Sequence, residues 1–494
     1  MFLSGTSSRP WGRMIDIFQN YWPHILFVIS IAAGAVAAAH AAMTKEEARA
    51  AIGWVGVILL SPLLGAALYL VAGVNRIRHK ALATRKSGHR RFDKQIHEHA
   101  LSPHRIVAEF GQPYGALNRL GDAFTRFYMT SGNTIAMLES GDRAYREIVE
   151  AIDGARHSVL LESYIFDNDE IGRRIADRLL AAKARGVEVR VLIDAVGARY
   201  SFPSIVNYFR QRGLNARSFN GNVIMGLRMP YANLRTHRKI IVIDDNLAFT
   251  GGMNIRESFT TEFAGAESAH DTHFRVTGPV VRDLFAVASE DWHFSTGERL
   301  SPIARPLQGA VEPTYMRVVS SGPDGSIETN RNVIIGALSV AQKHVRLMSP
   351  YFLPDRELVS AFATAARRGV RIDILVPQEN NLRLVDLAMM AQFDQVVKHG
   401  CHVWRVGGMF NHSKLMTIDG VWSYVGTSNM DPRSLRLNFE VDLEVLDSRF
   451  AEEIEKRVDA ALGEARELTL SDIRDRPLPY RLSEKVVWLA SPYL

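Results

Sequence analysis

The sequence predicts an α/β protein in which two similar α/β domains pack face to face about a pseudo-two-fold axis, behind an N-terminal membrane hairpin. Three observations predict this architecture. A short motif of histidine, lysine and aspartate occurs once in each half of the chain. Stretches of strand and helix length around the two copies resemble each other. The first eighty residues are largely apolar, whereas the rest has the mixed composition of a globular protein.

Two apolar stretches open the chain. Tyr21–Met43 and Ala50–Val74 are each long enough to cross the hydrocarbon layer of a bilayer as a helix. Only a short polar turn separates them. We therefore expect an N-terminal tail over residues 1–20 and a two-helix transmembrane hairpin over residues 21–80, with spans at about 21–43 and 50–74.

Basic residues around this hairpin predict its orientation. Arg9 and Arg13 precede the first span, and a run of cations follows the second: Arg76, Arg78, Lys80, Arg85, Lys86, Arg90 and Arg91. Because lysine and arginine concentrate on the cytoplasmic side, we expect both ends of the hairpin there. The alternative is a signal peptide cleaved near Ala39-His40-Ala41. The long polar leader and the immediate second apolar stretch argue against it.

The remaining chain divides into a linker and two repeated domains. We expect a basic juxtamembrane linker over 81–125, a first α/β domain over 126–310 and a second over 311–494. The repeat is visible outside the motif, since residues 158–164 resemble 344–351 and residues 184–190 resemble 366–372. In both halves a strand, a helix and a second strand precede the motif, which is typical of α/β units.

The motif has the form His-x-Lys-x4-Asp. Its members are His237, Lys239 and Asp244 in the first copy and His412, Lys414 and Asp419 in the second. In both copies a glycine follows the histidine by fourteen residues and an asparagine by seventeen, at Gly251 and Asn254 and at Gly426 and Asn429. One such match is a weak signal. Two copies with matching glycine and asparagine indicate a shared chemical purpose.

The spacing suits a phosphodiester. Residues 238–243 and 413–418 have the composition of strands, in which positions i and i+2 share a face, so each histidine projects beside its lysine. A lysine can hold non-bridging phosphoryl oxygens and stabilise the charge that develops on them. A histidine can attack phosphorus or protonate the leaving oxygen. Because one motif supplies only one of these histidine roles, two facing copies complete a site.

Carboxylates are expected in two different roles. Asp244 and Asp419 complete the motif, but seven residues along a strand place each on the face opposite its histidine, so we expect them to bond backbone in turns. A nucleophilic histidine also needs a carboxylate on its second ring nitrogen. Downstream candidates are Asp271 and Glu440. We expect Gly251, Gly252 and Gly426 to be close-approach or turn positions.

The repeated motif resembles the phospholipase D superfamily, and its surroundings are similar to bacterial cardiolipin synthases over nearly the whole chain. The stretches that carry the likeness include residues 65–73, 251–254, 349–352, 429–434 and 438–440. The resemblance implies that Asp271 and Glu440 orient the histidines. It also favours phosphate binding by Asn254 and Asn429 over helix capping. It places the protein in the bacterial cytoplasmic (inner) membrane as a multi-pass protein, with its catalytic domains on the cytoplasmic side.

The resemblance further implies a reaction. Histidine attack on one phosphatidylglycerol releases glycerol and leaves a phosphatidyl-histidine; a second phosphatidylglycerol then displaces the histidine and yields cardiolipin. By analogy His237 is the nucleophile and His412 the general acid and base, although the motifs are too symmetrical for the sequence to decide. No cofactor is expected. The expected partners are phosphatidylglycerol and other anionic phospholipids.

The cysteine count and net charge of the chain limit the alternative functions. The single cysteine, Cys401, excludes an intramolecular disulfide and a cysteine-rich zinc site. The net charge of +6 suits a membrane surface as well as nucleic acid, but much of the excess lies beside the hairpin, so no nucleic acid is expected. Three alternatives stay open: phospholipase D hydrolysis or transfer to another alcohol, a membrane-tethered nuclease, and a non-catalytic membrane scaffold.

Overall fold

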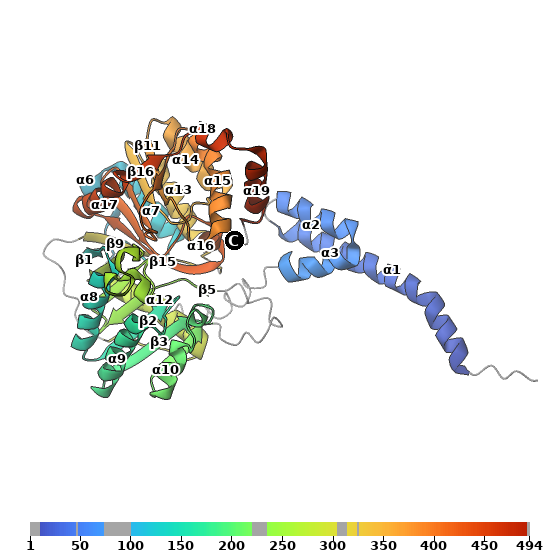
Figure 1. Ribbon diagram of the computed structural model, residues 1–494, viewed down its shortest axis with the longest axis horizontal. Coiled ribbons are helices and arrows are strands. Elements are labelled where there is room, and N and C mark those ends of the chain that lie inside the picture. The colour runs from blue at the N-terminus through green and yellow to red at the C-terminus, as the bar shows by residue number, and fades with distance from the viewer. Residues whose placement is uncertain are drawn as a thin grey trace, which may run out of the picture. The chain divides into compact units, whose positions relative to one another are not determined.

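The computed structural model describes residues 10–45, 48–73, 100–219, 235–303, 314–323 and 326–491. They fall into two compact units, a small helical unit near the N-terminus and a larger α/β unit (Figure 1). Residues 1–9 and the cations between Arg76 and Arg91 lie outside the described part of the chain. The first nine residues of the expected tail and the juxtamembrane charges therefore stay predictions from sequence, whereas residues 10–20 of that tail belong to helix α1.

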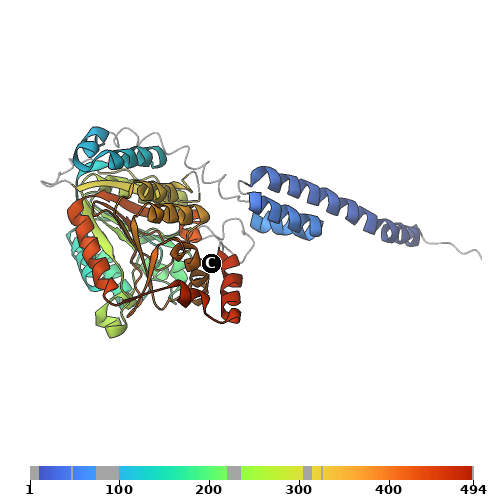
Figure 2. The same ribbon diagram turned by 90° about the horizontal axis from the view of Figure 1, so that it is seen from above.

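The N-terminal unit is built on one long helix. Helix α1 spans Pro10–Thr44, and its segment Tyr21–Thr44 is long and apolar enough to cross a membrane, in agreement with the first expected span. Helix α2 (Ala48–Leu60), helix α3 (Pro62–Leu68) and the π-helical turn η1 (Tyr69–Gly73) follow, with α2 and α3 packed against α1 (Figures 1 and 2).

The second apolar stretch differs from the prediction, because it is not one continuous crossing helix. It breaks at Ser61–Pro62, where proline has no NH to continue the helix and its ring obstructs the preceding turn. The chain then turns back on itself. At its far end the Lys45 ammonium donates to the Gly73 carbonyl at 2.6 Å, so the stretch ends close to where it began. Residues 48–73 thus form a folded-back pair of helices beside α1.

The α/β unit contains one sixteen-stranded sheet that runs through both halves of the chain. The first half supplies β1 (Thr130–Leu138), β2 (Ser158–Ser163), β3 (Glu188–Asp194), β4 (Asn215–Phe219), β5 (Arg235–Thr236), β6 (Ile240–Ile243), β7 (Leu247–Gly251) and β8 (His273–Thr277). The second half supplies β9 (Thr314–Ser321), β10 (His344–Met348), β11 (Arg371–Pro377), β12 (His402–Val406), β13 (Leu415–Ile418), β14 (Trp422–Gly426), β15 (Asn438–Leu446) and β16 (Ala465–Glu467).

The strand order shows the internal repeat. It reads β16-β12-β11-β10-β13-β14-β15-β9-β1-β8-β7-β6-β2-β3-β4, so apart from β16 each half repeats the other in reverse from the β9–β1 junction. In each half three strands run parallel, as strand–helix–strand connections require, and apart from β5, which pairs in parallel with β15, the others are antiparallel. The expected strand–helix–strand unit before each motif is present as β2-α9-β3 and β10-α14-β11.

The two halves meet edge to edge, which corrects the expected face-to-face packing. Strands β1 and β9 pair directly, with Thr130 opposite Met316 and Asn133 opposite Thr314. Backbone hydrogen bonds therefore continue across the junction and leave no free sheet edge there. A shared apolar cluster, which includes Phe285 of the first half and Phe450 of the second, lies along this junction.

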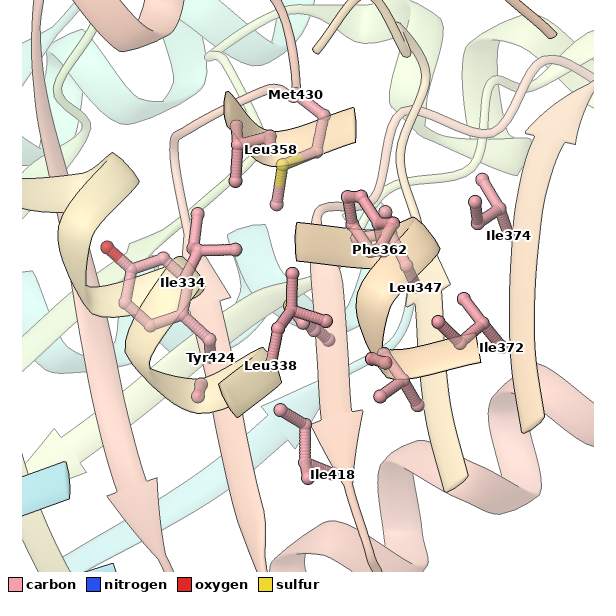
Figure 3. Packing of buried hydrophobic residues seen from close by; sticks show 14 of the residues in the cluster. Ile334, Leu338, Leu347, Leu358, Phe362, Ile372, Ile374, Ile418, Tyr424 and Met430 are labelled. Atoms are coloured by element: carbon pink, nitrogen blue, oxygen red, sulfur yellow. The ribbon is translucent and has the colours of Figure 1, made fainter. Parts of the chain in front are cut away.

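Helices cover the sheet in both halves. The first half has α8 (Gly141–Gly154), α9 (Glu170–Ala184), α10 (Ile205–Gln211), α11 (Thr261–Ala264) and α12 (Val280–Thr296). The second has α13 (Thr329–Val340), α14 (Arg356–Arg367), α15 (Arg383–Val397), α16 (Pro432–Arg436), α17 (Ser448–Leu462), α18 (Leu470–Arg474) and α19 (Leu478–Leu489). Figure 3 shows Leu338 and Phe362, from α13 and α14, packed with Ile372 and Ile418 of the sheet.

Equivalent helices begin in the same way in the two halves. The Asp169 carboxylate accepts from the Gly172 NH at 2.8 Å, and Asp355 accepts from the Leu358 NH at 3.0 Å. Each aspartate thus satisfies a backbone donor that a helix start leaves without a partner. The repeat therefore extends to the caps that begin α9 and α14.

Part of the expected linker is folded. Within residues 81–125, Pro103–Phe110 forms α6 and Gln112–Phe124 forms α7. Their side chains Ile106, Tyr114 and Leu117 are buried in the core of the second half. The basic composition of the linker did not predict this packing. The apolar residues of α6 and α7 recur at the spacing of a surface helix with one buried face, and that face packs on the core.

Candidate active site

The two motif histidines sit where the halves of the α/β unit meet. Strand β5, which leads into His237, pairs in parallel with the start of β15, and the His237 NH donates to the Phe439 carbonyl at 2.9 Å. In the equivalent place the His412 NH donates to the His270 carbonyl at 2.7 Å. Each motif is thus anchored to backbone of the opposite half, which brings together two segments far apart in sequence.

The expected carboxylates lie on the histidines, and each comes from the opposite half. Glu440 Oε2 is 2.9 Å from His237 Nδ1, and Asp271 Oδ2 is 2.8 Å from His412 Nδ1. Both carboxylates and both imidazoles are buried. Each carboxylate accepts a hydrogen bond from a protonated Nδ1 and leaves Nε2 as the ring nitrogen available to a substrate.

The motif lysines lie beside their own histidines, although the strands begin later than expected. Strand β6 starts at Ile240 and β13 at Leu415, so neither motif histidine lies within a strand. Lys239 Nζ nevertheless donates to the His237 carbonyl at 2.7 Å, and Lys414 Nζ is 2.9 Å from His412 Nδ1. The expected proximity of histidine and lysine therefore holds without a regular strand.

Burial sets the protonation of the imidazoles. Burial, together with the charge of the neighbouring lysines, lowers the pKa of His412 to about 4 and that of His237 well below its usual range. Both rings are therefore neutral near pH 7. A neutral imidazole whose Nδ1 proton is held by a carboxylate presents a free lone pair on Nε2, which is the form required for attack on phosphorus.

The lysines and carboxylates are also perturbed. Burial lowers the pKa of Lys239 to about 7 and that of Lys414 to about 8. Burial raises the pKa of Glu440 to about 7, whereas Lys414 and His412 outweigh burial at Asp271 and hold its pKa below the usual value. A bound phosphodiester would raise the pKa of both lysines, because its negative charge favours their charged form.

Supporting groups hold the two carboxylates in place. The Thr427 hydroxyl donates to Glu440 Oε2 at 2.6 Å, and the Thr272 NH donates to Asp271 Oδ1 at 2.7 Å. A Cβ on Gly252 would lie 2.3 Å from Asp271 Oδ1, so only glycine leaves room for this carboxylate. Gly252 thus matches the close-approach role expected for the glycines that follow the motif.

The motif aspartates take no part in this cluster. Asp244 accepts from the NH groups of Arg156, His157 and Ser158 at 2.7–2.9 Å. Asp419 accepts from Gln342, Lys343 and His344 at 2.8–2.9 Å. As members of the motif both aspartates are catalytic candidates, but these contacts assign them a structural role. They bond backbone, as the strand spacing predicts, but the backbone belongs to the turns that enter β2 and β10 and not to their own turns.

The two motif asparagines differ in their contacts. Asn254 Oδ1 accepts from the Ile165 NH at 3.1 Å, which leaves its NH2 group as the end that can donate. Asn429 is equally buried, and its Oδ1 has no hydrogen-bond partner in the described part of the chain. Both are compatible with phosphate binding, which stays a prediction.

Several residues around the histidines were not assigned a role from sequence. Tyr164 lies against His237 with ring centroids 5.2 Å apart, and Tyr351 lies against His412 at 6.1 Å. Asp194 Oδ2 accepts from the Thr236 NH at 3.2 Å and so supports the segment before His237. The two tyrosines stand at matched positions of the repeat, which is the signal that could have identified them.

The fold and this site define a class of protein: a two-motif, phospholipase D-like α/β protein with paired histidines. The model of a family described as "Cardiolipin synthase, PLD-like domain" matches residues 148–268 and 334–462. A second, described as "Phospholipase_D-nuclease N-terminal", matches residues 32–73. The matched regions cover about half of the chain, and both motifs lie within them.

Sequence identity to curated relatives identifies the family of this chain within that class. The chain is 31% identical to cardiolipin synthase A of Pseudomonas fluorescens over 96% of this chain and 99% of that protein. It is 31% identical to a cardiolipin synthase of Alkalihalophilus pseudofirmus over 89% of this chain and 88% of that one. The chain belongs to the cardiolipin synthase family. This membership and the apolar helix of residues 21–44 together indicate that it associates with a membrane.

A solved structure gives the same fold. The phosphatidylserine synthase of Haemophilus influenzae aligns with a TM-score of 0.57 at 17% identity, over 76% of this chain and 100% of that one. At this identity the likeness concerns the fold alone. It supports the phospholipase D-like α/β architecture with no inference about substrate.

Proposed function

We propose that this protein transfers a phosphatidyl group from one phosphatidylglycerol to another, giving cardiolipin and glycerol. One observation carries the proposal: two buried imidazoles each have Nδ1 on a carboxylate from the opposite half and a lysine alongside. Such a pair supplies a nucleophile and a proton carrier on one phosphodiester. Relatives that match nearly the whole chain carry the name cardiolipin synthase.

In the first step His237 Nε2 forms a bond to phosphorus and the bond from phosphorus to the glycerol oxygen breaks. The negative charge of the bound phosphodiester favours the protonated form of His412. Its Nε2 proton passes to that oxygen, so glycerol leaves neutral, His412 becomes neutral and a phosphatidyl-histidine remains. Glu440 stabilises the charge that develops on His237. The assignment of nucleophile and acid follows family analogy, because the two imidazoles have equivalent surroundings.

In the second step His412 acts as a general base instead of a general acid. It takes the proton from a hydroxyl of a second phosphatidylglycerol, and that oxygen displaces His237 from phosphorus. Lys239 and Lys414 hold the non-bridging oxygens and stabilise their charge in both steps. Asn254 and Asn429 are proposed to donate their side-chain NH groups to the same oxygens. One phosphodiester bond forms as another breaks, so no nucleotide is required.

The finer localisation belongs to the same proposal. The α/β unit would lie on the cytoplasmic side of a bacterial inner membrane. The seven cations that follow the second apolar stretch support the cytoplasmic placement, because lysine and arginine concentrate on the cytoplasmic side of a membrane.

The test is turnover by purified full-length protein in mixed micelles that contain phosphatidylglycerol as the only phospholipid. We expect cardiolipin and free glycerol in equal amounts, and loss of both in His237→Ala and His412→Ala. After a denaturing quench at mildly alkaline pH, where phosphohistidine is stable, a radiolabelled phosphatidyl group should remain on His412→Ala, with no more than one glycerol released per protein, but not on His237→Ala.

The products distinguish the alternatives. Phosphatidic acid without cardiolipin would replace the proposal with hydrolysis. Unchanged turnover in either histidine variant would refute the two-histidine mechanism. A label that remains on His237→Ala and not on His412→Ala would exchange the two assigned roles.

A further inference from the structure

Helix α19 exposes an apolar stripe while its other face is fixed to the α/β unit. Leu478, Leu482, Val486 and Leu489 recur at the spacing of one helix face, and each is 58–73% exposed. On the other face the Trp488 indole NH donates to Gln392 of α15 at 2.6 Å. The outward stripe is therefore held in place by packing and is not a loosely attached end.

Two tips expose further apolar side chains, in the connections that follow the equivalent strands β3 and β11. Tyr200 and Phe202 follow β3, and Phe202 is fully exposed. Leu382 and Leu384 follow β11 and are about half exposed. The α19 stripe and these two tips are called the apolar rim below. Isolated exposed apolar residues are ordinary, but clusters of them in corresponding connections beside one site indicate an interaction surface.

The tips border the catalytic histidines. Asn381, next to Leu382, accepts from the Tyr351 hydroxyl at 2.9 Å, and Tyr351 lies against His412. On the other side Tyr200 is close enough to act with burial in raising the pKa of the Tyr164 hydroxyl, and Tyr164 lies against His237. The tips thus continue the aromatic walls of the site out to the surface.

The rim is continuous within the α/β unit. Helix α19 packs against α15, which begins directly after Leu382. Tyr200 of the first half acts electrostatically on Tyr351 of the second, so the two tips approach each other across the site. The α19 stripe is thus connected through α15 to the tip at Leu382, and the two tips lie on either side of the tyrosines that contact the histidines.

Charge indicates what covers this rim. Each part carries an exposed arginine among its apolar side chains: Arg199, Arg383 and Arg481. None of the three forms an ion pair with any residue the structure describes. Exposed cations between apolar side chains suit an anionic lipid surface, where the apolar groups enter the acyl boundary and the cations stay at the headgroups. An interface with a second copy would bury these like charges against each other.

We propose that the apolar rim docks the α/β unit directly onto a phospholipid surface with anionic headgroups, so that the histidine site faces the lipid. This contact is separate from the anchor formed by the N-terminal helices. It goes beyond the transfer reaction. A lipid could then reach the site without its acyl chains passing through water.

The test uses single cysteines on the full-length protein in vesicles of phosphatidylcholine and phosphatidylglycerol. The one natural cysteine, Cys401, is buried, and the unmodified chain serves as the labelling background. Leu482→Cys, Phe202→Cys and Leu384→Cys each carry a fluorophore that spin-labelled lipids quench. Val36→Cys on α1 is the control for membrane insertion. Glu452→Cys is the matched control on α17, which Figure 1 shows on the side of the α/β unit away from α19.

We expect all three rim labels to be quenched by lipids spin-labelled near the headgroup, more strongly as the phosphatidylglycerol content rises, and Glu452→Cys to be quenched by neither shallow nor deep labels. Rim labels quenched no more than Glu452→Cys would overturn the proposal. Disulfide formation between unlabelled Leu482→Cys chains, together with no quenching of the labelled protein, would assign the rim to a second copy and would also overturn it. The readout needs no turnover, so it stands or fails independently of the proposed reaction.

Discussion

At the scale of single residues, the site depends on carboxylates supplied across the pseudo-two-fold axis. Glu440 follows the second motif in the chain but holds the first histidine, and Asp271 does the reverse. Each half is therefore incomplete alone, since its histidine would lack the group that fixes its tautomer.

Neutralising either carboxylate should disable its histidine. We expect Glu440→Gln and Asp271→Asn each to lower kcat by about 10²–10⁴-fold, because an amide does not fix the tautomer or stabilise the imidazolium. Steady-state cardiolipin synthesis would measure this. Asp283→Asn is the matched control: burial raises the pKa of Asp283 to about 8, so that carboxyl is already neutral at pH 7. A loss in the control equal to that in the two variants would contradict the assigned roles.

The lowered pKa values of the two lysines predict that kcat/KM falls on the alkaline side of its pH profile. Lys239 must be charged to hold phosphoryl oxygens, and its pKa in the free protein is lowered to about 7, so kcat/KM should fall as pH rises above that value. Arginine stays charged throughout this range. In Lys239→Arg the fall should therefore move toward about 8, the pKa of Lys414. A profile of kcat/KM that stays level up to pH 9 would show that lysine charge does not govern binding.

At the scale of elements, the motif aspartates stabilise the entries to β2 and β10. Asp419→Ala leaves three backbone NH groups without their acceptor, and we expect it to lower the free energy of unfolding by about 2–4 kcal/mol. Thermal unfolding would measure this. Asp459→Ala, which removes an exposed carboxylate that pairs with Arg346, should cost much less. Folded Asp419→Ala enzyme assayed below its unfolding temperature should keep most of its kcat; its complete loss would restore a catalytic role.

The folded-back helices predict a membrane topology different from a two-span hairpin. Because Lys45 contacts Gly73, both ends of residues 48–73 should lie at one membrane face, while the start of α1 lies at the other. With the basic cluster inside, Lys45→Cys should resist an impermeant thiol reagent added to intact cells, and Ser4→Cys should react. The opposite pattern would restore the two-span hairpin expected from apolar length.

At the scale of the whole α/β unit, a buried arginine joins the two halves. Arg238 pairs with Asp291 in the first half, and its Nε and Nη2 donate to Glu440 and Ser321 carbonyls of the second half at 3.0 and 3.1 Å. The second motif has Ser413 at the equivalent position, bonded to Thr272 at 2.9 Å. The molecule is therefore not symmetrical in what ties its halves together.

Removing this arginine should destabilise the unit as a whole. Arg238→Met leaves the buried Asp291 carboxylate without its cation, at a cost of about 3–5 kcal/mol. Arg238→Met with Asp291→Leu should recover much of that loss, because both charges are gone. Unfolding in detergent followed by circular dichroism would compare the two. A double variant no more stable than the single one would show that Asp291 is not what makes the arginine necessary.

The sequence by itself determined the chemistry and the repeat. His237, Lys239, His412 and Lys414 could be identified because their spacing is local and occurs twice. The same holds for the strand–helix–strand units before each motif, whose periodicity is set by neighbouring residues. Strand spacing also predicted that the motif aspartates bond backbone.

Only the tertiary structure decided which carboxylate serves which histidine, that the halves join through β1 and β9, and that α6 and α7 belong to the second half's core. It also decided that the second apolar stretch turns back at Pro62. These features depend on contacts between segments far apart in sequence, and local patterns of residue type carry no information about such pairings. The position of the exposed rim was also decided only by the tertiary structure. The sequence of a helix or loop does not show whether its apolar residues face the core or the solvent.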